Sequence, residues 1–135
     1  MPRFTNMLLA GVVALAGIAA QAAPSRAERG AAELARALEG RTAGEPVRCL
    51  NMSDIRSSRI ITGTAVLYET TNGTLYLNRP RGGARSLDRD DILVSRVFGS
   101  RICAPETIHL LSPPSHIPSG FISLGDFVPY RKPRS

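Results

Sequence analysis

The stretch TAVLYETTNGTLYLNR, residues 64–79, decides the fold of this chain. Two runs of β-branched, aromatic and aliphatic residues flank Asn72-Gly73, a dipeptide typical of two-residue type I′ hairpin turns. The stretch therefore predicts two antiparallel strands, Thr64–Thr70 and Thr74–Arg79.

A two-residue turn at Asn72-Gly73 also predicts which residues lie opposite each other. The predicted pairs are Tyr68 with Leu77, Thr70 with Leu75, and Val66 with Arg79. The core-facing side of the hairpin would then carry Val66, Tyr68, Leu75 and Leu77. The other side would carry Leu67, Glu69, Tyr76 and Asn78, and it is only half apolar.

Outside the hairpin, five more short runs have strand character and are separated by Gly, Pro, Asn or Asp. They are Val47–Leu50, Arg59–Thr62, Ile92–Phe98, Thr107–Leu111 and Phe121–Val128. Helical periodicity is absent after Gly40, which argues against parallel βαβ units. We expect residues 47–130 to form a mainly β domain, a small antiparallel barrel or sandwich of about six to seven short strands.

One amphipathic helix is expected before this domain. Ser25 and Glu28 form a capping box, apolar residues then recur at helical spacing, and Gly40 is placed to end the helix. The apolar face is mostly alanine, so we expect the helix to be weakly attached. Residues 23–46 are thus a helix and a linker, and residues 131–135 are a basic tail that we expect to be disordered.

Residues 1–22 have the features of a cleavable export signal. Arg3 precedes a chargeless apolar run from Met7 to Ala20, and Ala20-Gln21-Ala22 offers the small residues that signal peptidase requires. As a helix the run spans roughly 21 Å, less than the ~30 Å hydrocarbon core of a bilayer. We therefore predict a periplasmic or secreted mature chain, Ala23–Ser135, which has no transmembrane segment and is a monomer.

The two cysteines, Cys49 and Cys103, are 54 positions apart. In an exported chain their simplest use is a disulfide, which would stabilise the fold by roughly 4 kcal/mol through the entropy of the unfolded chain. The alternative is a zinc site that uses Cys103 with His109 and His116, but the spacing fits no common zinc motif. We expect no metal and no cofactor.

The search for catalytic residues leaves two histidines. His109 lies in a predicted strand, and His116 lies in a proline-rich loop that we expect to be extended and exposed. No nucleophile motif accompanies either residue. His116 is therefore a candidate ligand contact, and a hydrolase or metalloprotein that uses His109 and His116 is the third of three functional hypotheses.

Basic residues outnumber acidic ones, 17 to 11, and three arginines gather in the glycine-rich segment RPRGGAR, residues 79–85. Arg79, Arg81 and Arg85 are candidates for binding an anionic polymer or lipid headgroup, the second hypothesis. Specific nucleic-acid binding is not expected, because the segment has no aromatic residue for stacking on bases.

Several short motifs resemble an uncharacterised family of small exported or lipid-anchored proteobacterial envelope proteins, known by a domain of unknown function. The motifs are RCLN at 48–51, DI at 54–55, YLNR at 76–79, RIC at 101–103 and LGDFVPY at 124–130, so the resemblance covers about Val47–Lys132. Family members often carry a second cysteine pair, where this chain has Ala84 and Ile122. The resemblance implies an envelope protein and supplies no activity or catalytic residue.

These observations favour a non-catalytic exported binding module, held by one disulfide, as the first hypothesis. Its partner would be an envelope protein or a surface ligand, which the sequence does not identify.

Overall fold

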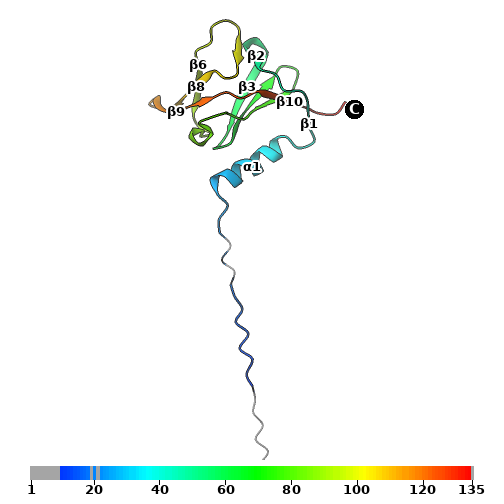
Figure 1. The fold of residues 1–135 in the computed structure, drawn as a ribbon, viewed down its shortest axis with the longest axis vertical. Helices are drawn as coiled ribbons and strands as arrows, with labels where there is room; N and C mark the ends of the chain where they lie inside the picture. The colour runs from blue at the N-terminus through cyan, green and yellow to red at the C-terminus, as the bar shows by residue number, and fades with distance from the viewer. Residues whose placement is uncertain (1–9, 19, 21, 135) are drawn as a thin grey trace, which may run out of the picture.

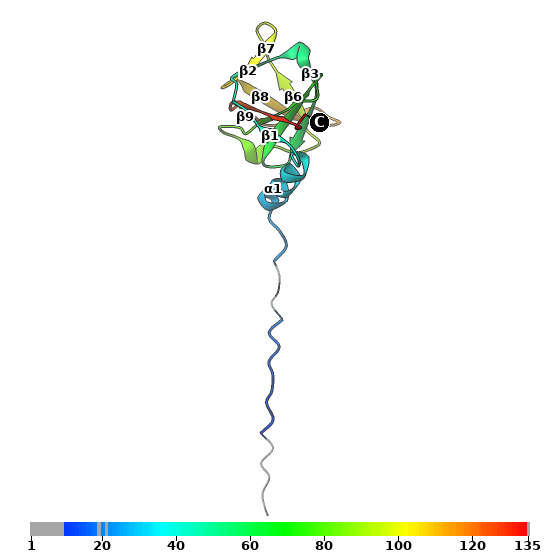
Figure 2. The same cartoon turned by 90° about the vertical axis from the view of Figure 1, so that its right-hand side faces the viewer.

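The structure, a computed structural model, describes residues 10–18, 20 and 22–134, and in this range it has one α-helix and ten strands (Figures 1 and 2). A five-stranded sheet has the order β1-β10-β5-β4-β3, with bounds Thr42–Ala43, Phe127–Arg131, Leu75–Asn78, Ala65–Thr70 and Ile55–Ile61. A three-stranded sheet has the order β6-β8-β9, with bounds Ile92–Ser95, Thr107–Ser112 and Ile117–Ser123. A two-stranded sheet pairs β2, Cys49–Asn51, with β7, Arg101–Cys103.

All strand pairs are antiparallel, and the sheets form a sandwich-like arrangement rather than a closed barrel. The predicted mainly β fold is therefore confirmed, but the described chain has more strands than expected. The predicted strand Phe121–Val128 is in fact the end of β9 and the start of β10, separated by residues 124–126. The two-residue β1 and the three-residue β7 were not predicted, because such short runs carry no periodicity. β10 also extends to Arg131, one residue into the expected tail.

The predicted register of the central hairpin is wrong by one residue. The loop has three residues, Thr71 to Gly73, and Gly73 takes the left-handed conformation with φ 85°. The Asn72 side chain holds this loop, since its Oδ1 accepts hydrogen bonds from the Thr74 N–H (3.1 Å) and the Thr70 hydroxyl (2.6 Å). The observed pairs are Val66 with Asn78, Leu67 with Leu77, Tyr68 with Tyr76, and Glu69 with Leu75.

This register gives the five-stranded sheet two apolar faces instead of one. The inner face packs on the other two sheets in a larger core, which contains Leu50, Ile60, Val66, Tyr68, Leu87, Ile102, Ile108, Leu110, Ile122, Leu124 and Phe127. The outer face forms a smaller core of Ile61, Ala65, Leu67 and Leu77 with Leu34 of the helix. Leu77 therefore lies on the opposite face from Val66 and Tyr68, contrary to our prediction.

Within the larger core, the rings of Tyr68 and Phe127 meet edge to face, with centroids 5.7 Å apart. Burial of the Tyr68 side chain raises its pKa to about 12, because the phenolate would lose its hydration.

The helix α1, Arg26–Ala37, covers the outer face of the sheet (Figure 1). The predicted capping box is present, since Ser25 Oγ accepts from the Glu28 N–H (3.1 Å) and Glu28 Oε2 accepts from the Ser25 N–H (2.9 Å). Of the helix residues, only Gly30 and Leu34 are buried. Leu34 is only 3% exposed, and the Arg26 guanidinium donates to the carbonyl oxygen of Leu87 at 2.6 Å.

The predicted signal peptide lies partly outside the described residues. Its described residues are 10–18, 20 and 22, of which 10–18 run as an extended chain away from the domain (Figure 1). Within the part of the chain that the structure describes, helices are all too short or too polar to cross a bilayer.

Candidate functional site

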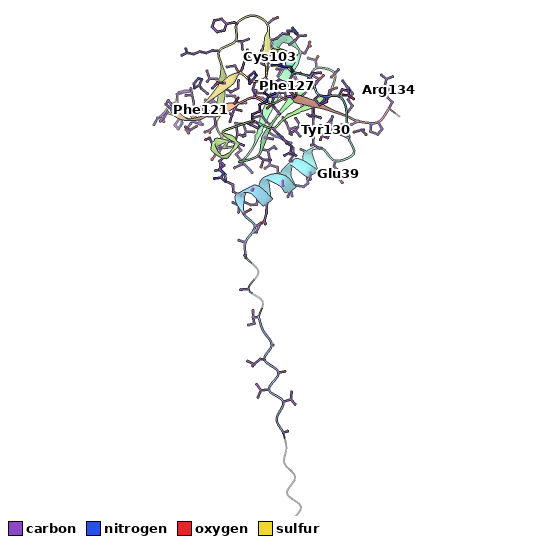
Figure 3. The ribbon with its side chains drawn as sticks, viewed as in Figure 1. Glu39, Cys103, Phe121, Phe127, Tyr130 and Arg134 are labelled. Carbon is purple, nitrogen blue, oxygen red and sulfur yellow. A yellow bond between two sulfur atoms is a disulfide. The ribbon has the colours of Figure 1, made fainter. Side chains whose placement is uncertain are left out.

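The predicted disulfide is present. Cys49 of β2 and Cys103 of β7 lie directly opposite each other, with Cα atoms 4.0 Å apart and a bond between their sulfur atoms. Their neighbours Leu50 and Ile102, also paired, turn into the larger core. The bond therefore joins the two strands of this small ribbon to each other, near the end of the molecule farthest from α1 (Figure 3).

The three arginines of the predicted anion-binding loop have different surroundings. Arg79 is exposed directly after β5, and Arg81 forms an ion pair with Asp126 at 3.5 Å. Arg85 lies on the 3₁₀ turn η2, Ala84–Ser86, beside Arg26 and the start of α1. The ion pair of Arg81 lowers the net positive charge that this loop offers to a ligand.

The two histidines are both exposed. His109 is on β8, opposite Phe121 on β9 and Val94 on β6. His116 has φ 55° and lies in the tight turn between β8 and β9, so the predicted extended loop is wrong. Cys103 is disulfide-bonded and supplies no thiolate, and the described residues contain no group of three or more His, Cys, Asp or Glu side chains arranged to hold a metal ion.

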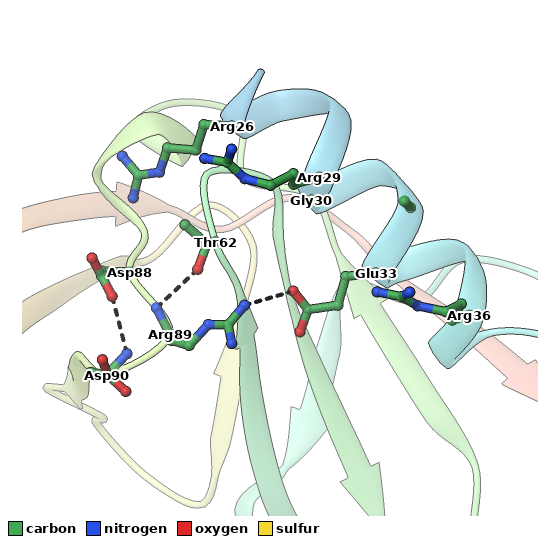
Figure 4. A pocket seen from close by; sticks show the side chains of 10 residues that line it. Arg26, Arg29, Gly30, Glu33, Arg36, Thr62, Asp88, Arg89 and Asp90 are labelled. Carbon is green, nitrogen blue, oxygen red and sulfur yellow. Dashed lines mark hydrogen bonds and ion pairs between the residues drawn. The ribbon is translucent and has the colours of Figure 1, made fainter. Parts of the chain in front are cut away.

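A cavity of about 550 Å³ lies between α1 and the loop before β6 (Figure 4). Four arginines and three carboxylates line it: Arg26, Arg29, Arg36, Arg89, Glu33, Asp88 and Asp90. Arg89 spans the gap, with an ion pair to Glu33 at 3.3 Å and a backbone N–H that donates to Thr62 Oγ1 at 3.2 Å. The four positive and three negative charges of this cavity largely cancel, so it is a poor site for a charged ligand. Its ion pair between Arg89 and Glu33 instead joins α1 to the loop before β6.

Positive charge gathers instead around the turn between β4 and β5. Two adjoining cavities of about 530 and 320 Å³ share Arg41 and Glu69 in their walls. Together they are lined by five cationic side chains and one carboxylate: Arg41, Arg59, Arg131, Lys132, Arg134 and Glu69. We call these two cavities and these six residues the basic groove.

The cations of the basic groove come from four parts of the chain. Arg41 follows α1, and its Nη1 donates to the carbonyl oxygens of Gly73 (2.9 Å) and Tyr130 (3.3 Å), which fixes the guanidinium beside the hairpin turn. Arg59 lies on β3, and Arg131 ends β10. Arg134 extends outward from the domain (Figure 3). None of the five cations forms an ion pair with a described carboxylate, so their charge remains available to a ligand.

The sequence did not indicate the basic groove, because its residues were assigned to a linker, a strand and a tail. They meet only because β10 pairs with both β1 and β5, which brings positions about 90 residues apart together. The arginine excess was the only signal, and it does not say where the arginines gather.

Compared with known proteins, the chain matches no family model, no curated protein and no solved structure. The resemblance to an envelope-protein family therefore stays a prediction, and the functional argument depends on the geometry described above.

Proposed function

We propose that this protein is an exported, disulfide-stabilised binding module without catalytic activity, and that it binds an extended polyanion in the basic groove. The observation that carries the proposal is the excess of five cations over one carboxylate along two adjoining cavities. Such an excess favours ligands with repeated phosphate or carboxylate groups.

The arrangement of the cations supports a polymer rather than a small anion. Arg59 borders one cavity, Arg131, Lys132 and Arg134 border the other, and Arg41 borders both. The charges therefore extend over both cavities, with four of the five cations around the larger one. A polyanion can neutralise several of them at once and release several counterions from its own backbone.

Export is part of the proposal and is supported by the disulfide, since such bonds persist mainly in oxidising compartments. A mass spectrum of the protein from the cell envelope, recorded without reductant, tests it. We expect the mass of Ala23–Ser135 less two hydrogens. A mass that retains residues 1–22 or two free thiols would contradict export.

The binding experiment measures the affinity for inorganic polyphosphate at several salt concentrations. The test variant replaces Arg131, Lys132 and Arg134 by alanine, and the matched control replaces Arg79, Arg81 and Arg85. Both variants lose three positive charges, so only the location of the charges differs. We expect the groove variant to bind at least about tenfold more weakly and to lose roughly two to three units of salt slope, with a small change in the control.

Two results would overturn the basic groove as the site. Equal losses in both variants would mean attraction by net charge alone. A loss confined to the control variant would assign the ligand to the loop of Arg79, Arg81 and Arg85.

A further inference from the structure

The loop between β6 and β7, residues 96–100, carries an unusually exposed aromatic side chain. Phe98 is 97% exposed, whereas the other exposed large apolar side chains of residues 23–134 reach at most 61%. The loop forms the end of the domain farthest from α1 in both views (Figures 1 and 2). Folding gains nothing from a phenylalanine in this position, since its apolar surface stays in water.

The loop is held in place on both sides of Phe98. Val97 packs against the larger core, and the Ser100 carbonyl oxygen accepts a hydrogen bond from the Met52 N–H at 2.8 Å. Gly99 turns the chain between them with φ 98°. Because the chain is anchored at Val97 and at Ser100, Phe98 is directed outward by the fold rather than by a loose chain.

Positive charge flanks the exposed ring. Arg96 and Arg101 are both exposed, and neither forms an ion pair with a described carboxylate. Met52 belongs to the 3₁₀ turn η1, Met52–Asp54, and adds a second apolar side chain, 43% exposed, beside the loop. Asp54, the carboxylate on this turn, accepts a hydrogen bond from the Asn51 side chain at 3.4 Å.

We propose that the β6–β7 loop inserts Phe98 into the interfacial region of an anionic lipid bilayer. The Phe98 ring would enter the acyl-chain boundary of the bilayer, while Arg96 and Arg101 would contact the anionic lipid headgroups. A protein partner would instead need a pocket shaped for one ring. No residue of the basic groove belongs to this loop or to η1, so the inference does not depend on the proposed function.

The chain has no tryptophan, so a Phe98→Trp variant would carry a single tryptophan at the tip of the loop, which can be excited selectively over the three tyrosines. We expect its emission to shift to shorter wavelength when vesicles of phosphatidylglycerol and phosphatidylcholine in equal parts are added. Vesicles of phosphatidylcholine alone should give a much smaller shift, because they lack the negative charge that attracts Arg96 and Arg101.

Co-sedimentation of the disulfide-bonded protein with the same vesicles gives the second measurement. Phe98→Ala should lower the partition coefficient of the protein into the vesicles by about tenfold, as expected for the loss of one inserted phenylalanine. The matched control is Phe121→Ala, which removes a ring that is 61% exposed on β9 and should leave binding unchanged. Circular dichroism checks that each variant folds.

Three outcomes would overturn the proposal. The first is an unshifted emission together with equal sedimentation of the wild type and Phe98→Ala. The second is a dimer, detected by analytical ultracentrifugation, that Phe98→Ala dissociates while vesicles have no effect; the loop would then serve self-association. The third is vesicle binding that is lost in the Arg131, Lys132 and Arg134 variant but kept in Phe98→Ala, which would assign the membrane to the basic groove.

Discussion

Ionisation of the buried Tyr68 side chain is expected to make the domain less stable at alkaline pH. Its pKa is about 12 in the folded protein and near 10 in the unfolded chain, so folding opposes its ionisation. A group with a raised pKa contributes fully below pH 10, and the contribution is lost as the pH rises towards 12. We expect the free energy of unfolding to fall by about 2 kcal/mol between pH 10 and pH 12, measured by urea titration.

The control for this prediction is Tyr68→Phe, which keeps the ring against Phe127 and removes the titrating group. The difference between wild type and variant should change between pH 10 and 12 and remain constant below pH 10. Parallel pH profiles for the two proteins would contradict the assignment to Tyr68.

The burial of Asn78 could not be predicted from the sequence pattern around it. We assigned it to the half-apolar side of the hairpin that faces away from the predicted core, but it is fully buried. Its side-chain amide forms two hydrogen bonds with the backbone of Gly125, of 2.8 and 3.0 Å. This contact fixes the chain between β9 and β10. An asparagine in a strand is ordinarily a surface residue, and its partner lies 47 positions away, so local pattern could not identify the pair.

At the scale of elements, Gly30 allows α1 to approach the sheet closely. A Cβ atom at this position would lie 2.7 Å from the Thr62 carbonyl oxygen and closer still to Thr64 Oγ1. Alanine has the higher helix propensity, by about 1 kcal/mol, but the steric conflict should outweigh it. We therefore expect Gly30→Ala to lower the free energy of unfolding by about 1–3 kcal/mol, measured by thermal or urea unfolding.

The reverse exchange at an exposed position, Ala31→Gly, serves as the control. It changes helix propensity without affecting the interface and should cost about 1 kcal/mol. A Gly30→Ala variant more stable than the wild type would show that α1 does not need the close contact.

The elements were predicted unevenly, and the reasons are physical. The helix was identifiable from its capping box, and β4 and β5 from their apolar runs. The register failed because the Asn72 side chain stabilises a three-residue loop where the dipeptide pattern suggested two. That single residue moves Leu77 to the face covered by α1, where it packs in the smaller core with Leu34.

At the scale of the whole molecule, the disulfide is the strongest single constraint on the unfolded chain. Replacing both Cys49 and Cys103 by serine should lower the free energy of unfolding by roughly 4 kcal/mol, because the unfolded chain is no longer closed into a long loop. Urea unfolding of the variant and of the oxidised wild type measures the difference. Equal midpoints would contradict this prediction.

The fold class and the disulfide could be predicted from the sequence, but the candidate site could not. Cysteine pairing needs only two residues and an oxidising compartment, whereas the basic groove needs the order of strands. Arg41 and Arg131 lie on one side of the domain because β10 is placed between β1 and β5.

The same strand order has a consequence for how the chain acquires its structure. Residues 127–131 form β10, which pairs with both β1 and β5. The five-stranded sheet therefore cannot be completed before these C-terminal residues are available for pairing. Contacts between such distant positions also close late and slowly. For the proposed export, this delay would keep the largest sheet incomplete until nearly all of the chain has crossed the membrane.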